Sequence, residues 1–201
     1  MSVHVPESVP GAGAGPPAGR APRAGEARVT VEAAFAAAPL EPRARLLTAL
    51  AGLLAAVLAA LIGLTWHGGL VLLVGAPSLF VVVLAIPLAL SPAGYAVGQR
   101  ELVVLRRGLR PLVFPLGSLS AARQTAMPRS ARLPGSGGLF GWWGWFANPG
   151  WGRFKAYATD RRQGVLLEWP GFKLFVSPED PEGLCGAVVA RRHGPAKGGR
   201  P

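Results

Sequence analysis

Two long apolar runs dominate the hydrophobic pattern of this sequence. Leu46 to Leu64 holds nineteen residues without a charge, and Leu70 to Leu90 holds twenty-one. At about 1.5 Å rise per residue, a helix made of either run would reach roughly 30 Å, the thickness of a bilayer's hydrocarbon core. A helix in a soluble core, which is the alternative, would need one polar face, and the runs contain little that is polar beyond Thr48 and Ser78. The pattern predicts a transmembrane two-helix hairpin over residues 43–95.

The charges around these runs predict its topology. Arg43 and Arg45 stand directly before the first run, and Arg100 follows the second, whereas the segment between the runs has no Lys or Arg. Positive charges accumulate on the cytoplasmic side of membrane helices. We therefore expect a multi-pass protein of the cell membrane (inner or plasma membrane) with both termini in the cytoplasm.

The segments at the two ends of the chain have a different composition. Residues 1–42 consist mostly of Ala, Gly and Pro with few large apolar side chains. Such a segment buries too little apolar surface to offset the entropy lost on ordering. We predict a disordered tail here, with at most a short helix from Val29 to Ala38, and a second disordered tail at 193–201.

From about Val97 the pattern changes to short strands separated by turns. A loop rich in Pro, Gly and Ser is expected at 127–138, and the Trp-rich segment after it should form a hairpin around a turn at 148–150. The second strand of this hairpin is 153–159, and the other predicted strands are 101–106, 109–116, 117–124, 165–169 and 172–176, which makes roughly seven strands in a meander.

An amphipathic helix is predicted after the last strand. Residues 177–182 combine N-cap, proline and acidic first-turn signals. Leu184, Ala187 and Val188 then fall on one face of the helix. Strands followed by one such helix are typical of an α+β fold, a small barrel or sandwich that the helix caps.

Three motifs in this part of the chain resemble the bacterial pleckstrin-homology (PH-like) domain families, which typically follow one or two transmembrane segments. They are Gly152-Arg153-Phe154, Tyr157-Ala158-Thr159 and Ser177-Pro178-Glu179-Asp180-Pro181. The resemblance covers about residues 97–192. It implies a seven-stranded, two-sheet barrel closed by the C-terminal helix, and the family carries no catalytic motif.

Charge is concentrated in the C-terminal part of the chain. The formal net charge is +11, and the residues after Gly94 carry sixteen Arg or Lys against six acids. Four arginines lie close to the expected membrane surface: Arg100, Arg106, Arg107 and Arg110. Each such residue adds about 1 kcal/mol of attraction to anionic lipid. The alternative is that these charges only flank the membrane helices and set the topology and solubility of the protein. No motif for nucleic-acid binding accompanies them.

Aromatic side chains form the second cluster of interest. It contains Phe140, Trp142, Trp143, Trp145, Phe146 and Trp151. Side chains alternate along a strand, so Trp143 and Trp145 should share one face and leave Trp142 on the other. Two interpretations remain: an exposed patch that docks a partner or the bilayer interface, or packing into the core.

Catalytic, metal and cofactor chemistry is not expected. Cys185 is the single cysteine, and the three histidines stand alone without a nucleophile or a carboxylate pair nearby. No phosphate-binding loop or nucleophile elbow occurs.

The sequence thus predicts a membrane-anchored, non-enzymatic binding or scaffold protein whose cytoplasmic domain contacts a protein partner, a second copy or anionic lipid. The alternative is an accessory subunit of a membrane transport or envelope-assembly complex.

Overall fold

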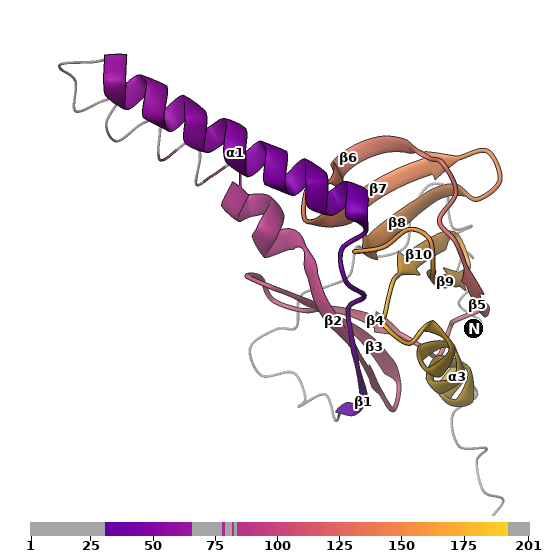
Figure 1. Ribbon diagram of the computed structural model, residues 1–201. Helices are drawn as coiled ribbons and strands as arrows, with labels where there is room; N and C mark the ends of the chain where they lie inside the picture. The colour runs from indigo at the N-terminus through magenta and orange to yellow at the C-terminus, as the bar shows by residue number, and fades with distance from the viewer. Residues whose placement is uncertain (1–30, 66–77, 79–81, 83, 193–201) are drawn as a thin grey trace, which may run out of the picture.

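The computed structural model describes residues 31–65, 78, 82 and 84–192. A long helix, α1 (Pro42–Thr65), extends from a domain of two β-sheets and a C-terminal helix, α3 (Pro181–Arg192), as Figure 1 shows. The fold class is α+β, as predicted. The predicted tails at 1–30 and 193–201 lie outside the described residues.

The first sheet has four antiparallel strands in the order β1-β2-β3-β4. They are β1 (Val31–Ala36), β2 (Pro92–Gly98), β3 (Glu101–Arg106) and β4 (Leu112–Pro115). The β3–β4 hairpin confirms the predicted pair of strands around Arg107-Gly108.

Strands β1 and β2 correct two expectations. Residues 31–36 are neither disordered nor helical, and residues 92–95, which were expected to belong to the membrane hairpin, lie in the strand β2. The two segments pair with each other, with Ala33 opposite Val97 and Phe35 opposite Tyr95. Alanine-rich segments favour helix locally, but the pairing of β1 with β2, which lie on either side of α1 in the chain, overrides that preference. The domain therefore includes residues before α1, and a boundary at Val97 is wrong.

The second sheet has six strands in the order β5-β9-β10-β8-β7-β6. They are β5 (Ala121–Thr125), β6 (Ala131–Gly138), β7 (Gly141–Asn148), β8 (Gly152–Ala158), β9 (Gly164–Trp169) and β10 (Phe172–Val176). The pairing of β10 with β8 is parallel, so the sheet is not a simple meander. Strand β6 lies where a loop was predicted; its register shifts between Arg132 and Gly135, which accommodates the proline and glycines there.

The predicted closed barrel of seven strands is wrong. Ten strands are described, and no strand pairing among the described residues closes the two sheets into one barrel. The sheets are joined where Ala37 forms an isolated bridge with Pro178 and the Ala38 amide donates to the Ser177 carbonyl at 2.9 Å. They are also joined where the Trp169 indole N–H of β9 donates to the Pro115 carbonyl of β4 at 2.8 Å. The three strands that were not predicted, β1, β2 and β6, add to the width of the two sheets.

Two hydrophobic cores lie on opposite faces of the six-stranded sheet. The first fills the space between the sheets and α3, where Leu184 and Val188 are fully buried, as the predicted stripe requires. The second contains Phe146, Phe154 and Ala44, the last from the first turn of α1. Helix α1 is therefore attached to the domain through apolar contacts as well as through the chain.

Beyond its first turn α1 exposes large apolar side chains. Eight are 45–61% exposed: Leu46, Leu47, Leu50, Leu53, Leu54, Val57, Leu58 and Leu61. Its stretch Pro42–Leu61, with a mean hydropathy of 2.1, is the one described helix with the length and composition to cross a membrane. The second predicted span lies largely outside the described residues, of which 84–90 are helical, so the two-helix hairpin stays a prediction.

A buried polar network near the start of α1 joins the middle of β2 to the ends of β8 and β10 and to the segment after β1. The Tyr95 hydroxyl donates to the Tyr157 carbonyl at 2.7 Å and accepts from the Ser177 amide at 3.2 Å. The Ser177 hydroxyl accepts from the Thr159 amide at 2.8 Å, and the Thr159 hydroxyl donates to the Ala38 carbonyl. Burial raises the pKa of Tyr95 well above its ordinary range, so its hydroxyl remains a donor at physiological pH.

Replacing Tyr95 with Phe tests this network. The change leaves the Tyr157 carbonyl and the Ser177 amide without their buried partner, and we expect it to lower the free energy of unfolding by about 1–3 kcal/mol. Urea denaturation of the detergent-solubilised chain, followed by tryptophan fluorescence, measures it. Tyr157→Phe is the control, because that hydroxyl is not in the network; equal losses for both variants would contradict the network's importance.

The docking of α3 gives a second prediction. Leu184→Asp places an unpaired charge in the first core, and we expect a loss on the order of 3–5 kcal/mol in the same denaturation assay. Val189 lies on the same helix but is 41% exposed, so Val189→Asp should change stability little. A small effect at both positions would mean that α3 does not hold the core together.

Candidate functional site

Two hairpin turns of the domain lie against the helical part of the chain. The first, between β3 and β4, is the basic turn, residues 106–110. Its Arg107 amide donates to the Ser91 carbonyl and its Gly108 amide to the Ala89 carbonyl, both at 3.2 Å. A Cβ on Gly108 would come within 2.7 Å of the Ala89 Cβ, so this approach requires glycine. The basic turn is therefore fixed at the end of helical residues 84–90.

The arginines of the basic turn present their charge to solvent. The Arg106 guanidinium donates to the Arg110 carbonyl through Nε at 3.0 Å and Nη2 at 2.5 Å, which folds that side chain back across the turn. Arg107 and Arg110 are exposed, and Leu109 between them is 44% exposed. None of the ion pairs formed by the described residues includes these arginines. Their charge is available to an external anion.

The fourth predicted basic residue does not join this group. Arg100 precedes β3, whereas Arg106 ends it, so the two are separated by the length of the strand, roughly 20 Å at 3.3 Å per residue. The Arg100 carbonyl accepts from the Leu116 amide at 2.8 Å. The basic site is thus reduced to Arg106, Arg107 and Arg110.

The structure adds Lys155, which sequence reasoning did not single out. This residue of β8 lies with its Nζ 5.8 Å from the Trp145 ring centre and 5.6 Å from that of Tyr157. Burial, and secondarily the positive charge of Arg106, lower the pKa of Lys155. The alternation of side chains along β8 was the one signal in the sequence that could have singled out Lys155. It cannot reveal that Arg106, on the other sheet, lies within electrostatic range of Lys155.

The tryptophans follow the predicted alternation. Trp142 is 5% exposed in the second core, while Trp143 and Trp145 face the other side and pack against the first. The Trp143 indole N–H is buried and, among the described residues, finds no hydrogen-bond partner. Trp151 packs edge-on against Phe154, with 5.1 Å between the two ring centres. This burial favours the packing interpretation over one exposed aromatic patch.

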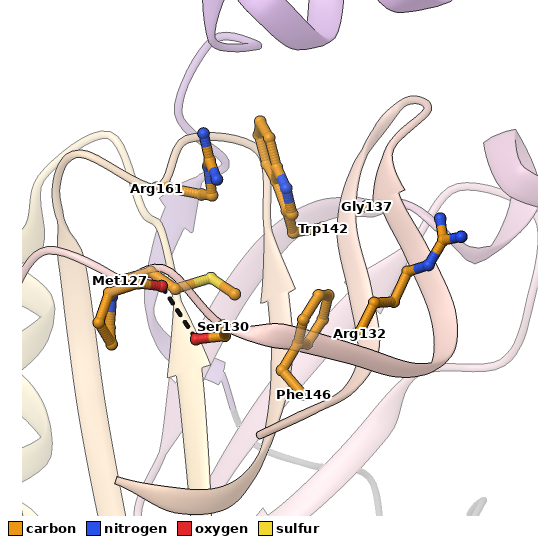
Figure 2. A pocket seen from close by; sticks show the side chains of 8 residues that line it. Met127, Ser130, Arg132, Gly137, Trp142, Phe146 and Arg161 are labelled. Atoms are coloured by element: carbon orange, nitrogen blue, oxygen red, sulfur yellow. Dashed lines mark hydrogen bonds between the residues drawn. The ribbon is translucent and has the colours of Figure 1, made fainter. Parts of the chain in front are cut away.

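A cavity of about 270 Å³ lies beside Trp142 (Figure 2). Trp142 and Phe146 line it with Met127, and Arg161 stands at its upper end, below α1, while the guanidinium of Arg132 turns away. The Arg161 guanidinium is 4.6 Å from the Trp142 ring centre and pairs with Glu41. This charge is thus already engaged in holding α1. Among the described residues no cluster of three His, Cys, Asp or Glu is placed to bind a metal.

The second turn, between β6 and β7, is the apolar turn, residues 138–141. The amide of Phe140 donates to the hydroxyl of Thr48 on α1 at 3.1 Å. The two turns thus contact opposite ends of the helical part of the chain, the basic turn at residues 89–91 and the apolar turn at residues 47–48.

Residues 94–192 match the family model described as a bacterial PH domain. The match supports the predicted PH-like family, and with it a binding role, because PH domains are typically binding modules without catalytic activity. Strand β1 and helix α1 lie outside the matched residues. No curated protein and no solved structure matches the chain.

The electrostatic repulsion between Lys155 and Arg106 gives a prediction about the pKa of Lys155. Arg106→Gln removes a nearby positive charge, so the pKa of Lys155 should rise toward its ordinary value of about 10.4 while remaining lowered by burial. NMR of ¹³C-methylated lysines measures it, and Lys155→Gln identifies the signal. Arg107→Gln carries the same charge change at the neighbouring residue; a shift as large as that of Arg106→Gln would contradict a specific pairing.

Proposed function

We propose that this chain is a membrane-anchored, non-enzymatic PH-like binding module of a bacterial cell membrane, with its domain in the cytoplasm. In this proposal the apolar helices anchor the domain, and the basic turn contacts anionic lipid headgroups. The match to a bacterial PH domain supports the binding role, and the length and hydropathy of Pro42–Leu61 support the anchor.

The attachment of the basic turn to Ala89 and Ser91 is the observation that carries this proposal. Residues 84–90 are the last described helical residues of the second apolar run. A run that crosses the bilayer ends at the headgroup region, and the backbone hydrogen bonds of Arg107 and Gly108 hold the turn at that end. Arginines at this height meet lipid phosphates without any movement of the domain.

The expected strength of this contact follows from its charge. Three juxtamembrane basic residues at about 1 kcal/mol each supply about 3 kcal/mol of attraction to an anionic surface. This corresponds to roughly a hundredfold preference for anionic lipid, and salt reduces it because the turn is exposed. A protein partner with an acidic surface would use the same three charges. The lipid-binding experiment below distinguishes anionic lipid from such a protein partner.

Replacement of Arg106, Arg107 and Arg110 by Ser tests the proposal. Native mass spectrometry of the full-length protein in detergent, titrated with phosphatidylglycerol or phosphatidylcholine, measures lipid binding. The unmodified chain should prefer phosphatidylglycerol, and the triple variant should lose most of that preference, by tenfold or more on the scale of about 1 kcal/mol per residue. The difference should shrink as ionic strength rises.

The matched control replaces Arg100, Arg123 and Arg129 by Ser. It removes the same charge away from the basic turn and should keep the lipid preference. Equal losses in the two triple variants would show a general charge effect and would contradict a lipid site at the basic turn. No preference for phosphatidylglycerol in the unmodified chain would favour an acidic protein partner instead.

A further inference from the structure

The apolar turn is held against α1 by close contacts. Besides the bond between Phe140 and Thr48, Gly138 lies so near α1 that a Cβ there would come within 2.8 Å of the Leu47 Cδ1. Gly138 also has a φ of +124°, which side-chain-bearing residues rarely adopt. The conformation requires glycine at this position, and the short distance shows how closely the turn approaches the Leu47 side chain.

The base of α1, residues 41–48, cannot move away from the domain without breaking several interactions. The Glu41 amide donates to the Thr159 carbonyl at 3.1 Å, and the Glu41 carboxylate pairs with Arg161 at 3.4 Å. Ala44 is fully buried in the second core, beside Trp142. The fold thus sets the position of the apolar turn along the axis of α1, which is called its height below.

This height coincides with a change in the character of α1. Residues up to Ala44 are held by the domain, whereas Leu46, Leu47 and the further leucines up to Leu61 are about half exposed or more. The contacts at Leu47 and Thr48 place the apolar turn at the start of the exposed apolar stretch. In a spanning helix, that point is the boundary between headgroups and hydrocarbon.

The composition of the turn suits that boundary. Residues 137–146 carry no charge, and Leu139 and Phe140 stand at the tip. Both side chains are half-buried and leave part of their apolar surface exposed. Apolar and aromatic side chains of this kind bury favourably about 5–10 Å into the headgroup and acyl boundary.

We propose that the apolar turn enters the bilayer interface beside α1 and forms a second membrane contact, with Leu139 and Phe140 among the lipid glycerol and upper acyl groups. This inference rests on the proposed function, because it requires α1 to cross the membrane. The occupant is the lipid surface, since the apolar surface of the turn is continuous with that of α1. The domain then meets the bilayer at two points, an electrostatic one at the basic turn and an apolar one here.

Site-directed spin labelling of the full-length chain tests this inference. In a Cys185→Ser background, single cysteines replace Phe140 at the apolar turn, Leu54 on α1, or Pro149 at the opposite end of β7. The labelled proteins are reconstituted in nanodiscs of phosphatidylcholine and phosphatidylglycerol. Collision rates with oxygen, which partitions into lipid, and with a water-soluble nickel chelate report the depth of each label.

We expect labels at 54 and 140 to have oxygen-to-nickel ratios several-fold higher than the label at 149. A lipid-exposed label at 54 combined with a water-exposed label at 140 would overturn this inference alone. A water-exposed label at 54 would overturn the anchor and the inference together. If Phe140→Cys does not fold, Leu139→Cys reports the same turn; low accessibility to both collision partners there would indicate a protein contact and would also overturn the lipid assignment.

Discussion

The buried hydrogen-bond network around Tyr95 and Ser177 is the interaction on which the rest of this structure depends. It joins the middle of β2 and the ends of β8 and β10 to the Ala38 carbonyl, shortly before α1. Its groups come from segments far apart in the chain, and each would be costly to bury without its partner. Together these bonds fix where the chain leaves the domain to begin the helix.

The helical segment therefore begins and ends at neighbouring strands. Strand β1 precedes it, β2 follows it, and the two pair side by side (Figure 1). A domain joined to a membrane helix by one short linker can swing about that linker, whereas this domain is held at both ends of the helical segment. The basic and apolar turns, which contact those two ends, consequently have a defined orientation toward whatever surrounds the helices.

The large positive charge of the domain separates into two classes. Arg123, Arg161, Arg162 and Arg191 are engaged in ion pairs with acids of the domain or of the segment around α1. These carboxylate partners offset the charge of the four arginines and leave less of it for a ligand. The basic turn also keeps its charge without a described carboxylate partner, and its attachment to Ala89 and Ser91 distinguishes it from other arginines without a described partner, such as Arg100 and Arg129.

The sequence by itself determined the elements whose signals are local. Strand β3 follows from its run of Leu and Val, β9 and β10 from apolar runs bounded by turns, and α3 from its capping residues and apolar stripe. Only the tertiary structure decided that the alanine- and glycine-rich segments β1, β2 and β6 are strands, because few of their side chains favour a strand locally and the pairing with neighbouring strands supplies the stabilisation. The candidate site shows both cases: the length of β3, a strand that the sequence predicted, separates Arg100 from Arg106, whereas the packing of the two sheets brought Lys155 within electrostatic range of Arg106. Spacing along a chain does not encode distances that arise from non-local pairing.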